Sequence, residues 1–190
     1  MNIVLLGRPG AGKGTQSLRC QQRYNLTSIT PGDLMRQEAQ RGTPLGNIFS
    51  GYLDAGDLAP DNMVMALVEK RIAAKASVGG LLFDGCPRAM PQAMSLERLL
   101  DAYDLQLDAV LLLDVAEAEV KKRIAERSKT SNRSDDRRVD KVMHRIQVYE
   151  QETRPVLDYY EKQGKLFRID GMGSTEEVFQ RMVEVLDGVK

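Results

Sequence analysis

The sequence predicts an α/β fold in which helices cover both faces of a five-stranded parallel sheet. Two observations support this fold class. Short apolar segments typical of strands recur along the 190 residues, at 2–6, 27–30, 81–84, 109–114 and 166–169. The stretches between them are charged, and their apolar residues repeat with a helical period. Such alternation is typical of a parallel sheet whose ligands bind beyond the carboxyl ends of its strands.

The first apolar segment leads into a glycine-rich turn. Gly7, Gly12 and Lys13 have the spacing of the Walker A phosphate-binding motif, and a helix-compatible stretch begins at Lys13. Glycines let the backbone approach a phosphate closely. The N–H groups of such a turn and the helix N-terminus attract anions, and Lys13 adds a mobile charge for the outer phosphates. We therefore predict a nucleotide-binding loop; a βα turn that binds nothing is the alternative.

Several predicted helices have clear starts, because capping and first-turn residues occur together there. These starts lie at Thr30-Pro31, Thr43-Pro44, Pro60-Asp61 and the capping box from Ser174 to Glu177. No strand signal separates the first three starts, which predicts a helical insertion between residues 30 and 60.

The chain between residues 128 and 164 holds two further segments. Residues 128–136 are polar and lack an apolar period, which predicts a surface loop and a candidate lid. Residues 137–164 predict a long helical stretch that Pro155 should kink or split. Its expected packing residues are Val139, Val142, Ile146, Tyr149, Val156, Leu157, Tyr159 and Tyr160.

Composition excludes several classes of partner. Lys and Arg together number 27, as do Asp and Glu, so the global charge favours neither nucleic acid nor an anionic membrane. No apolar run approaches the roughly 20 residues of a membrane span. No signal peptide is recognisable at the N-terminus. Cys20 and Cys86 lack the spacing of zinc ligands and predict free thiols, which indicates a reducing, cytoplasmic location.

Polar residues follow the third apolar segment. Asp84 ends it, and in a phosphate-loop fold an aspartate at this position reaches the Mg²⁺ that bridges ATP phosphates, through water; an ordinary loop-capping aspartate is the alternative. Arg88 is expected at the carboxyl edge of the sheet, where a phosphate would lie. Gln92, four residues later, carries an amide that suits a base edge. Arg36 follows the helix start at Thr30 and is expected to face the same cleft.

A series of arginines lies between residues 123 and 145. Phosphoryl transfer needs several cations around the developing charge, because the protein contributes mainly positioning and electrostatics. The candidate site residues are Arg123, Arg127, Arg133 and Arg145. Arg137 and Arg138 are expected on a solvated helix face. His144, the only histidine, is expected to be a surface or partly buried helix residue without a base role.

Seven segments in order resemble the adenylate kinase family in its short-lid form, within the nucleoside monophosphate (NMP) kinases. They are residues 7–15, 32–36, 58–61, 84–88 with Gln92, 123–127, 133–136 and 145–149. The resemblance implies a P-loop NTPase-type sheet with a core at 1–29, 60–126 and 137–190, a small helical NMP-binding insertion at 30–59, and a short lid at 127–136. It also implies reversible, Mg²⁺-dependent, direct in-line transfer of the γ-phosphoryl group of ATP to AMP, which gives two ADP.

By position, the resemblance assigns residues to each nucleotide. The ATP residues are Gly10, Ala11, Gly12, Lys13, Gly14, Thr15, Arg127 and Gly173. The AMP residues are Pro31, Arg36, Asp57, Leu58, Ala59, Gly85, Cys86, Pro87, Arg88, Gln92, Arg133 and Arg145. The catalytic residues are Lys13, Arg88, Arg123, Arg127, Arg133 and Arg145. Magnesium would be held through water by Asp84, with Thr15 as a second candidate. The short, cysteine-free lid implies no zinc, and the family suggests a monomer.

Four residues depart from the usual pattern of the family. Pro31 replaces a threonine, Cys86 a phenylalanine, Ala89 a threonine, and Arg8 a small residue of the phosphate loop. None of these changes removes a charged group required for transfer, but together they leave AMP affinity and base selectivity open. The alternatives are a kinase for UMP or CMP, which Gln92 disfavours, and a catalytically silent nucleotide-binding module.

Overall fold

The structure, a computed structural model, describes residues 1–75, 79–128 and 139–189, without the side chains of residues 75, 127, 128 and 139. Its sheet consists of β1 (Asn2–Gly7), β2 (Leu26–Ile29), β3 (Gly80–Asp84), β4 (Ala109–Asp114) and β5 (Leu166–Asp170). The five strands agree with the predicted segments to within about one residue at each end. All pair in parallel in the order β2-β3-β1-β4-β5, which confirms the predicted fold class.

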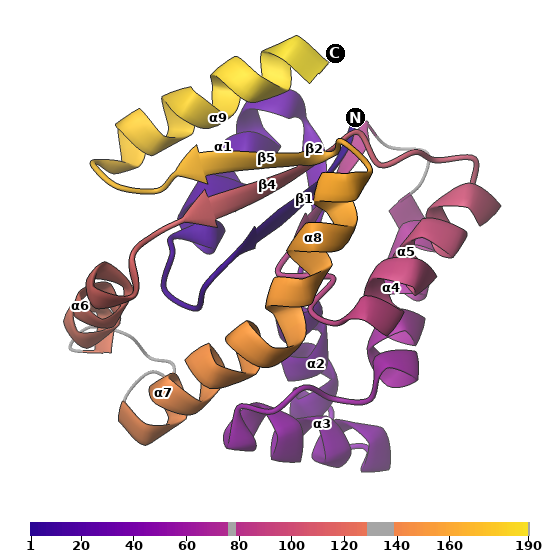
Figure 1. Ribbon diagram of the computed structural model, residues 1–190. Coiled ribbons are helices and arrows are strands. Elements are labelled where there is room, and N and C mark those ends of the chain that lie inside the picture. Colours follow the sequence, from indigo (N-terminus) through magenta and orange to yellow (C-terminus); the bar gives the residue numbers. More distant parts are fainter. Residues whose placement is uncertain (76–78, 129–138, 190) are drawn as a thin grey trace.

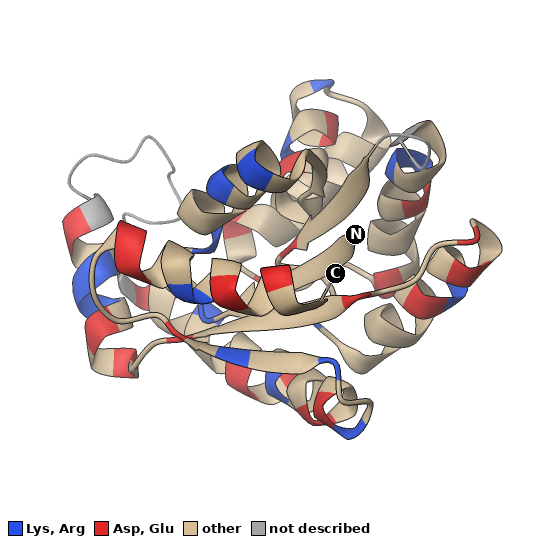
Figure 2. Ribbon diagram, turned by 90° about the horizontal axis from the view of Figure 1, so that it is seen from above, with Lys and Arg blue, Asp and Glu red and all other residues tan. Residues whose placement is uncertain are grey.

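Helices cover both faces of this sheet (Figure 1). Their bounds are α1 (Lys13–Tyr24), α2 (Pro31–Gln40), α3 (Pro44–Ala55), α4 (Asp61–Lys75), α5 (Met90–Ala102), α6 (Glu117–Ser128), α7 (Val139–Val148), α8 (Arg154–Lys162) and α9 (Thr175–Val189). Within the described ranges, none of them is long and apolar enough to cross a bilayer. Figure 2 shows positive and negative residues mixed along the helices, in keeping with the balanced charge of the sequence.

Two apolar clusters form the core, one on each side of the sheet. Successive side chains of a strand point to opposite faces, so Ile3 and Leu5 of β1 join α1, α6 and α9, whereas Val4 and Leu6 join α4, α5 and α8. Because β1 is fully buried on both faces, it is a near-continuous apolar run, as expected of a central parallel strand. Its carboxyl end, where the glycine-rich turn begins, is held between β3 and β4.

Residues 30–59, which we call the α2–α3 segment, carry a smaller cluster of their own. Met35, Phe49 and Ala59 are buried there with Val64 of α4. Helices α2 and α3 lie so close that a Cβ added at Gly46 would stand 2.2 Å from the carbonyl oxygen of Glu38. The predicted helices between β2 and α4 are therefore present, and a glycine allows them to pack.

The predicted helix starts are correct, with one exception in their chemistry. Thr43 Oγ1 accepts a hydrogen bond from Gly46 N at 3.0 Å. Ser174 and Glu177 form the reciprocal bonds of the predicted capping box. Thr30 occupies the N-cap position of α2 but makes no side-chain cap bond, so the predicted capping threonine is wrong in this respect. Its hydroxyl lies 3.2 Å from Ser28 Oγ, because the extended backbone at Thr30 continues the strand.

The long helical stretch is split, as Pro155 predicts. A π-helical turn, Tyr149–Thr153, separates α7 from α8, and Pro155 lies in the first turn of α8. Of the predicted packing residues, the side chain of Val139 lies outside the described residues and Tyr159 is only partly buried. The others are buried: Val142, Ile146, Tyr149, Val156, Leu157 and Tyr160. Cys20 and Cys86 are buried free thiols, as expected.

Candidate active site

Many of the predicted site residues that the structure describes line a cleft of about 740 Å³ at the carboxyl edge of the sheet. One wall consists of the phosphate loop, the start of α1 and the loop after β3. The α2–α3 segment forms the opposite wall, and Arg145 of α7 also reaches the cleft. From β1 the chain connects to β2 on one side of the sheet, and from β4 it connects to β5 on the other side. Parallel sheets bind ligands in the crevice that forms where the strand order changes direction in this way.

The phosphate loop owes its shape to glycines. Gly10 and Gly12 have φ of 90° and 100°, in the left-handed region that favours glycine. A Cβ at Gly10 would stand 2.7 Å from Ile124 Cγ1, so only a glycine lets the loop lie against α6. The loop is closed by a hydrogen bond from Ala11 N to Arg8 O at 3.0 Å, and α1 begins at once.

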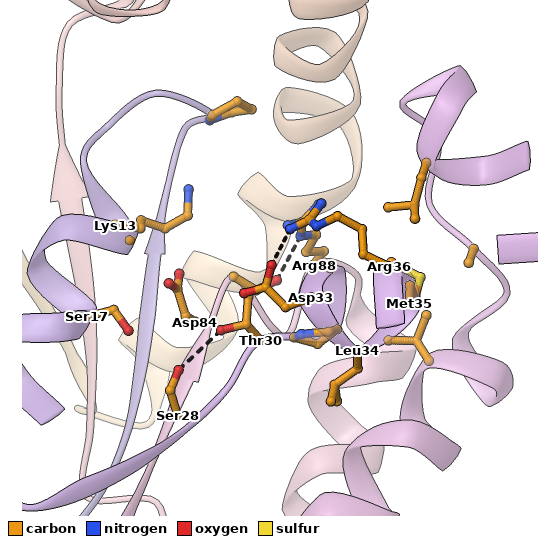
Figure 3. A pocket seen from close by; sticks show the side chains of 18 of the residues that line it. Lys13, Ser17, Ser28, Thr30, Asp33, Leu34, Met35, Arg36, Asp84 and Arg88 are labelled. Carbon is orange, nitrogen blue, oxygen red and sulfur yellow. Dashed lines mark hydrogen bonds and ion pairs between the residues drawn. The ribbon is translucent and has the colours of Figure 1, made fainter. Parts of the chain in front are cut away.

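Lys13 lies against this loop. Its Nζ donates to the carbonyl oxygens of Gly7 at 2.7 Å and Arg8 at 3.1 Å. The ammonium group therefore lies against the glycine-rich turn, as expected of the lysine in the Walker A spacing. Figure 3 shows Lys13 and Asp84 beside the same cavity, on neighbouring elements.

Asp84 ends β3 and is buried. Burial raises the pKa of this carboxyl group, whereas Lys13, Arg88 and a hydrogen bond with Ser17 act in the opposite direction. An isolated buried carboxylate is costly, and two flanking cations reduce that cost. Asp84 is thus a buried carboxyl group held among positive groups.

Arg88 is held in place by its own loop. Its Nε donates to Gly85 O at 2.7 Å, and its backbone N donates to Gln92 Oε1 at 2.9 Å. Gly85 has a φ of 69°, and a Cβ there would stand 3.1 Å from an Arg88 Nη atom. Burial and the neighbouring Arg145 lower the pKa of the guanidinium group of Arg88. The site therefore concentrates positive charge where an anion would relieve the repulsion.

Gln92 has both ends of its amide occupied. The oxygen accepts from Arg88 N, and Nε2 donates to Asp61 Oδ1 at 2.8 Å. These two bonds determine which way the amide faces, and one N–H and one lone pair remain for a further partner. Gln92 lines the cleft, as do Asp57, Leu58 and Ala59.

The α2–α3 segment supplies Arg36. Its guanidinium group donates to Asp33 Oδ1 at 2.5 Å and reaches the cleft beside Arg88 (Figure 3). On the same wall, Gly56 packs so closely on α7 that an added Cβ would lie 3.1 Å from Arg145 Cγ. His144 is exposed, as expected, and its Nε2 lies 2.6 Å from Asp57 Oδ1.

Not every predicted residue faces the cleft. Gly10, Gly12, Gly14 and Thr15 line it, and Pro31, Gly85 and Arg145 do as well, whereas Ala11, Cys86 and Pro87 are buried. Burial raises the pKa of Cys86 to about 12, so its thiol stays protonated.

Other predicted residues lie away from the cleft or outside the described residues. Gly173 lies in an exposed loop before α9. Arg123 donates to the carbonyl oxygen of Gly171 at 3.0 Å and pairs with Glu119. Arg133, Arg137, Arg138, the side chain of Arg127 and most of the predicted lid lie outside the described residues.

Sequence reasoning missed several polar residues of the site. Ser17 lies one helical turn after Lys13, and that spacing could have revealed it. Asp33, in the first turn of α2, pairs with Arg36, and a first-turn acid alone does not indicate such a role. Glu150 and Thr153 had no local signal, because their partners in the site are distant in sequence. Among the described residues, no group of three or more His, Cys, Asp or Glu forms a metal cage.

A phosphate loop after the first strand of a parallel five-stranded sheet, with arginines facing it across a cleft, defines a protein of the P-loop NTPase class. The family model of adenylate kinase matches residues 5–165. Adenylate kinases are among the similar curated proteins. That of Thermobifida fusca is 42% identical over 186 residues, covering 98% of both chains. That of Parabacteroides distasonis is 40% identical, and that of Flavobacterium psychrophilum 36%, each covering 100% of both chains. The chain belongs to the adenylate kinase family.

Proposed function

We propose that this protein transfers the γ-phosphoryl group of ATP to AMP, reversibly and by direct in-line attack, to give two ADP. The observation that supports this function best is the meeting of two phosphate-binding groups at one cleft. Lys13 and the glycine loop form one group, and Arg36 and Arg88 the other. A protein that bound a single nucleotide would not need the second group.

The residues have distinct tasks in this proposal. The backbone of residues 10–15 and Lys13 bind the β- and γ-phosphates of ATP, with the helix N-terminus of α1 adding partial positive charge. Arg36 and Arg88 bind the phosphate of AMP. Arg145, together with Arg123, Arg127 and Arg133, stabilises the charge that develops on the transferring group. No histidine or covalent intermediate is required.

The donor set at Asp84 fits Mg²⁺. A carboxylate oxygen beside a serine hydroxyl is the hard ligand that this ion prefers, and the ion keeps several waters when bound. Asp84 would hold it through water, with Thr15 as a second candidate. When bound with ATP, magnesium neutralises phosphate charge. The division into a core, an NMP-binding insertion at 30–59 and a lid at 127–136, the monomeric state and the cytoplasmic location are part of the same proposal.

Base selectivity rests on Gln92 and the wall formed by residues 57–59. Arg88 N and Asp61 orient the amide of Gln92. Its remaining N–H and lone pair therefore have fixed positions when a base binds beside them. A donor and an acceptor side by side suit the edge of adenine, although cytosine offers the same pattern. The position of Gln92 resembles adenylate kinases, the family to which the chain belongs, and we therefore propose AMP as the acceptor in preference to UMP or CMP.

An acceptor panel tests this function. ADP formation from ATP is measured with AMP, CMP, UMP and GMP, and AMP should give the highest kcat/KM. Equal or higher rates with a pyrimidine would overturn the AMP assignment. Tight ATP binding without turnover, at saturating AMP and magnesium, would instead favour the silent binding module.

Two variants test the site. Lys13→Ala and Arg88→Ala should each lower transfer at least about a hundredfold, the scale of losing one preorganised donor. Arg98→Ala, which removes an exposed arginine of α5, is the matched control and should leave the rate unchanged. Near-normal turnover of either site variant would contradict its role.

A further inference from the structure

The π-helical turn Tyr149–Thr153 lies where three parts of the site meet. It follows α7, which carries Arg145, and its side chains contact both the phosphate loop and the loop that carries Arg88. A single π-helical turn inside a helical stretch is rare and frequently marks a functional region. Here the turn contacts two loops of the candidate site.

The first contact joins the turn to the phosphate loop. Arg8 Nε donates to Glu150 Oε1 at 2.7 Å, and Arg8 Nη1 donates to Val115 O at 3.1 Å. The guanidinium carbon also lies 6.0 Å from the centre of the Tyr149 ring. The side chains of Arg8 and Glu150 are only 24% and 28% exposed, so water screens this pair less than a surface ion pair. Three contacts therefore orient Arg8.

The backbone of Arg8 in turn supports Lys13. The carbonyl oxygen of Arg8 accepts from Lys13 Nζ at 3.1 Å and from Ala11 N at 3.0 Å. A side chain that is anchored at its tip restricts the peptide from which it extends. Hence the pair with Glu150 bears on the position of the lysine ammonium group.

The second contact joins the same turn to the loop of Arg88. Thr153 Oγ1 donates to Arg88 O at 2.8 Å, and Thr153 is only 4% exposed. The backbone N of Arg88 is bound by Gln92, so this residue is held at both its N–H and its carbonyl group. This single turn thus contacts Arg8 of the phosphate loop and Arg88.

We propose that Arg8 and Glu150 are a positioning pair, which holds Lys13 in register with Arg88 and Arg145 by tying the phosphate loop to the π-helical turn. This inference rests on the proposed function, because register between two phosphate groups matters only if one is transferred to the other. Misplacement of reacting groups by about 1 Å can lower a rate about a hundredfold. The pair should therefore support kcat more than nucleotide binding.

A double-mutant cycle tests the pair. Arg8→Ala and Glu150→Ala should each lower kcat about 10-fold, while the KM for ATP changes less than about threefold. The double variant should be no slower than either single variant, because both break one link. Arg8→Lys, which keeps the charge, should recover part of kcat. Arg154→Ala is the matched control, since Arg154 pairs with the other oxygen of Glu150, is 69% exposed and has no contact with the phosphate loop; its kcat should stay within about twofold of wild type.

Hydrogen exchange separates failure of this inference from failure of the proposed function. The amide of Ala11, which donates to Arg8 O, should exchange at least about fivefold faster in Arg8→Ala and Glu150→Ala than in wild type or Arg154→Ala. This readout needs no turnover, whereas a wild-type protein that forms no ADP from AMP would count against the function alone. Multiplicative losses of kcat in the double variant, or variants that lose thermal stability with unchanged kcat and exchange, would overturn the positioning role.

Discussion

The two walls of the cleft differ in how they are built. The sheet wall stands on two extensive apolar clusters and holds the buried carboxyl group of Asp84. The α2–α3 segment stands on a small cluster of Met35, Phe49, Ala59 and Val64. A region with few buried apolar contacts opens at a lower free energy than the global unfolding of the protein. The sheet wall is thus suited to holding charge in place, and the α2–α3 segment is suited to local opening.

Replacing one buried phenylalanine in each wall should reveal the largest difference between the walls. Phe83 in β3 and Phe49 in α3 are both 0% exposed. Phe83→Ala should lower the global free energy of unfolding by about 3–5 kcal/mol. Phe49→Ala should lower it less, but should raise the KM for AMP at least about tenfold, because the segment that carries Arg36 opens locally. Urea denaturation and steady-state kinetics measure the two effects. Equal global losses would show that the walls unfold as one unit.

A pair of glycines in α3 tests the close packing of the α2–α3 segment. Gly46→Ala should destabilise the protein by about 1–3 kcal/mol, because its Cβ would overlap the Glu38 carbonyl group between the two helices. Gly51→Ala is the matched control, since nothing lies within 4 Å of an added Cβ there. It should stabilise the helix by up to about 1 kcal/mol. Thermal unfolding compares them, and a Gly46→Ala variant as stable as wild type would contradict the close packing of α2 on α3.

A variant of Asp84 tests how the sheet wall holds a buried carboxyl group. Burial raises its pKa in the folded state, so the protonated carboxyl group stabilises the fold. That stability is fully present below the unfolded pKa of about 3.9 and is lost as pH rises through the raised pKa. Asp84→Asn, which never ionises, should therefore be more stable than wild type at pH 7, with a difference that shrinks as pH falls. Its transfer rate should fall about 10–100-fold. Urea midpoints across this pH range, with ADP formation at pH 7, provide the measurement; a less stable variant would refute the sign.

The smallest effect is expected where the α2–α3 segment meets α7 at the surface. His144 of α7 and Asp57 form an exposed pair, with 44% and 50% of their side chains accessible. The contact is an ion pair only while His144 is protonated. Exposed ion pairs contribute about 0–1 kcal/mol, so His144→Gln should change the free energy of unfolding by less than about 1 kcal/mol. Chemical denaturation at low and high salt measures it. A loss of 2 kcal/mol or more (about twice that bound) would mean that this contact holds the α2–α3 segment to α7.

Local patterns predicted most of the fold. All five strands follow from short apolar runs, and the helix starts at residues 43 and 174 follow from capping residues that act on their own first turn. The one wrong detail, the cap at Thr30, arises because a hydroxyl can also bond to a neighbour on the preceding strand. Pro155 predicted a break in the helix; that the break is a π-helical turn depends on what surrounds it.

For the candidate site too, local patterns predicted some residues and missed others. Lys13, Asp84 and Arg88 were identifiable because a glycine loop and the ends of parallel strands place chemistry at known positions. The partners that restrain them were not identifiable. Gln92 and Asp61 are 31 residues apart, and Thr153 and Arg88 are 65 apart, and neither pair leaves a periodic or spacing signal.

The positions of strands, helices and the phosphate loop could be read from the chain alone, since apolar period, caps and glycine spacing act through near neighbours. Motifs in order also indicated the family. The strand order, the unequal packing of the two walls and the link from Arg8 to Glu150 across 142 residues became visible only in the folded structure. The physical reason is that such contacts depend on which elements the fold brings together, and a hydrogen bond between distant residues requires no pattern in the chain between them.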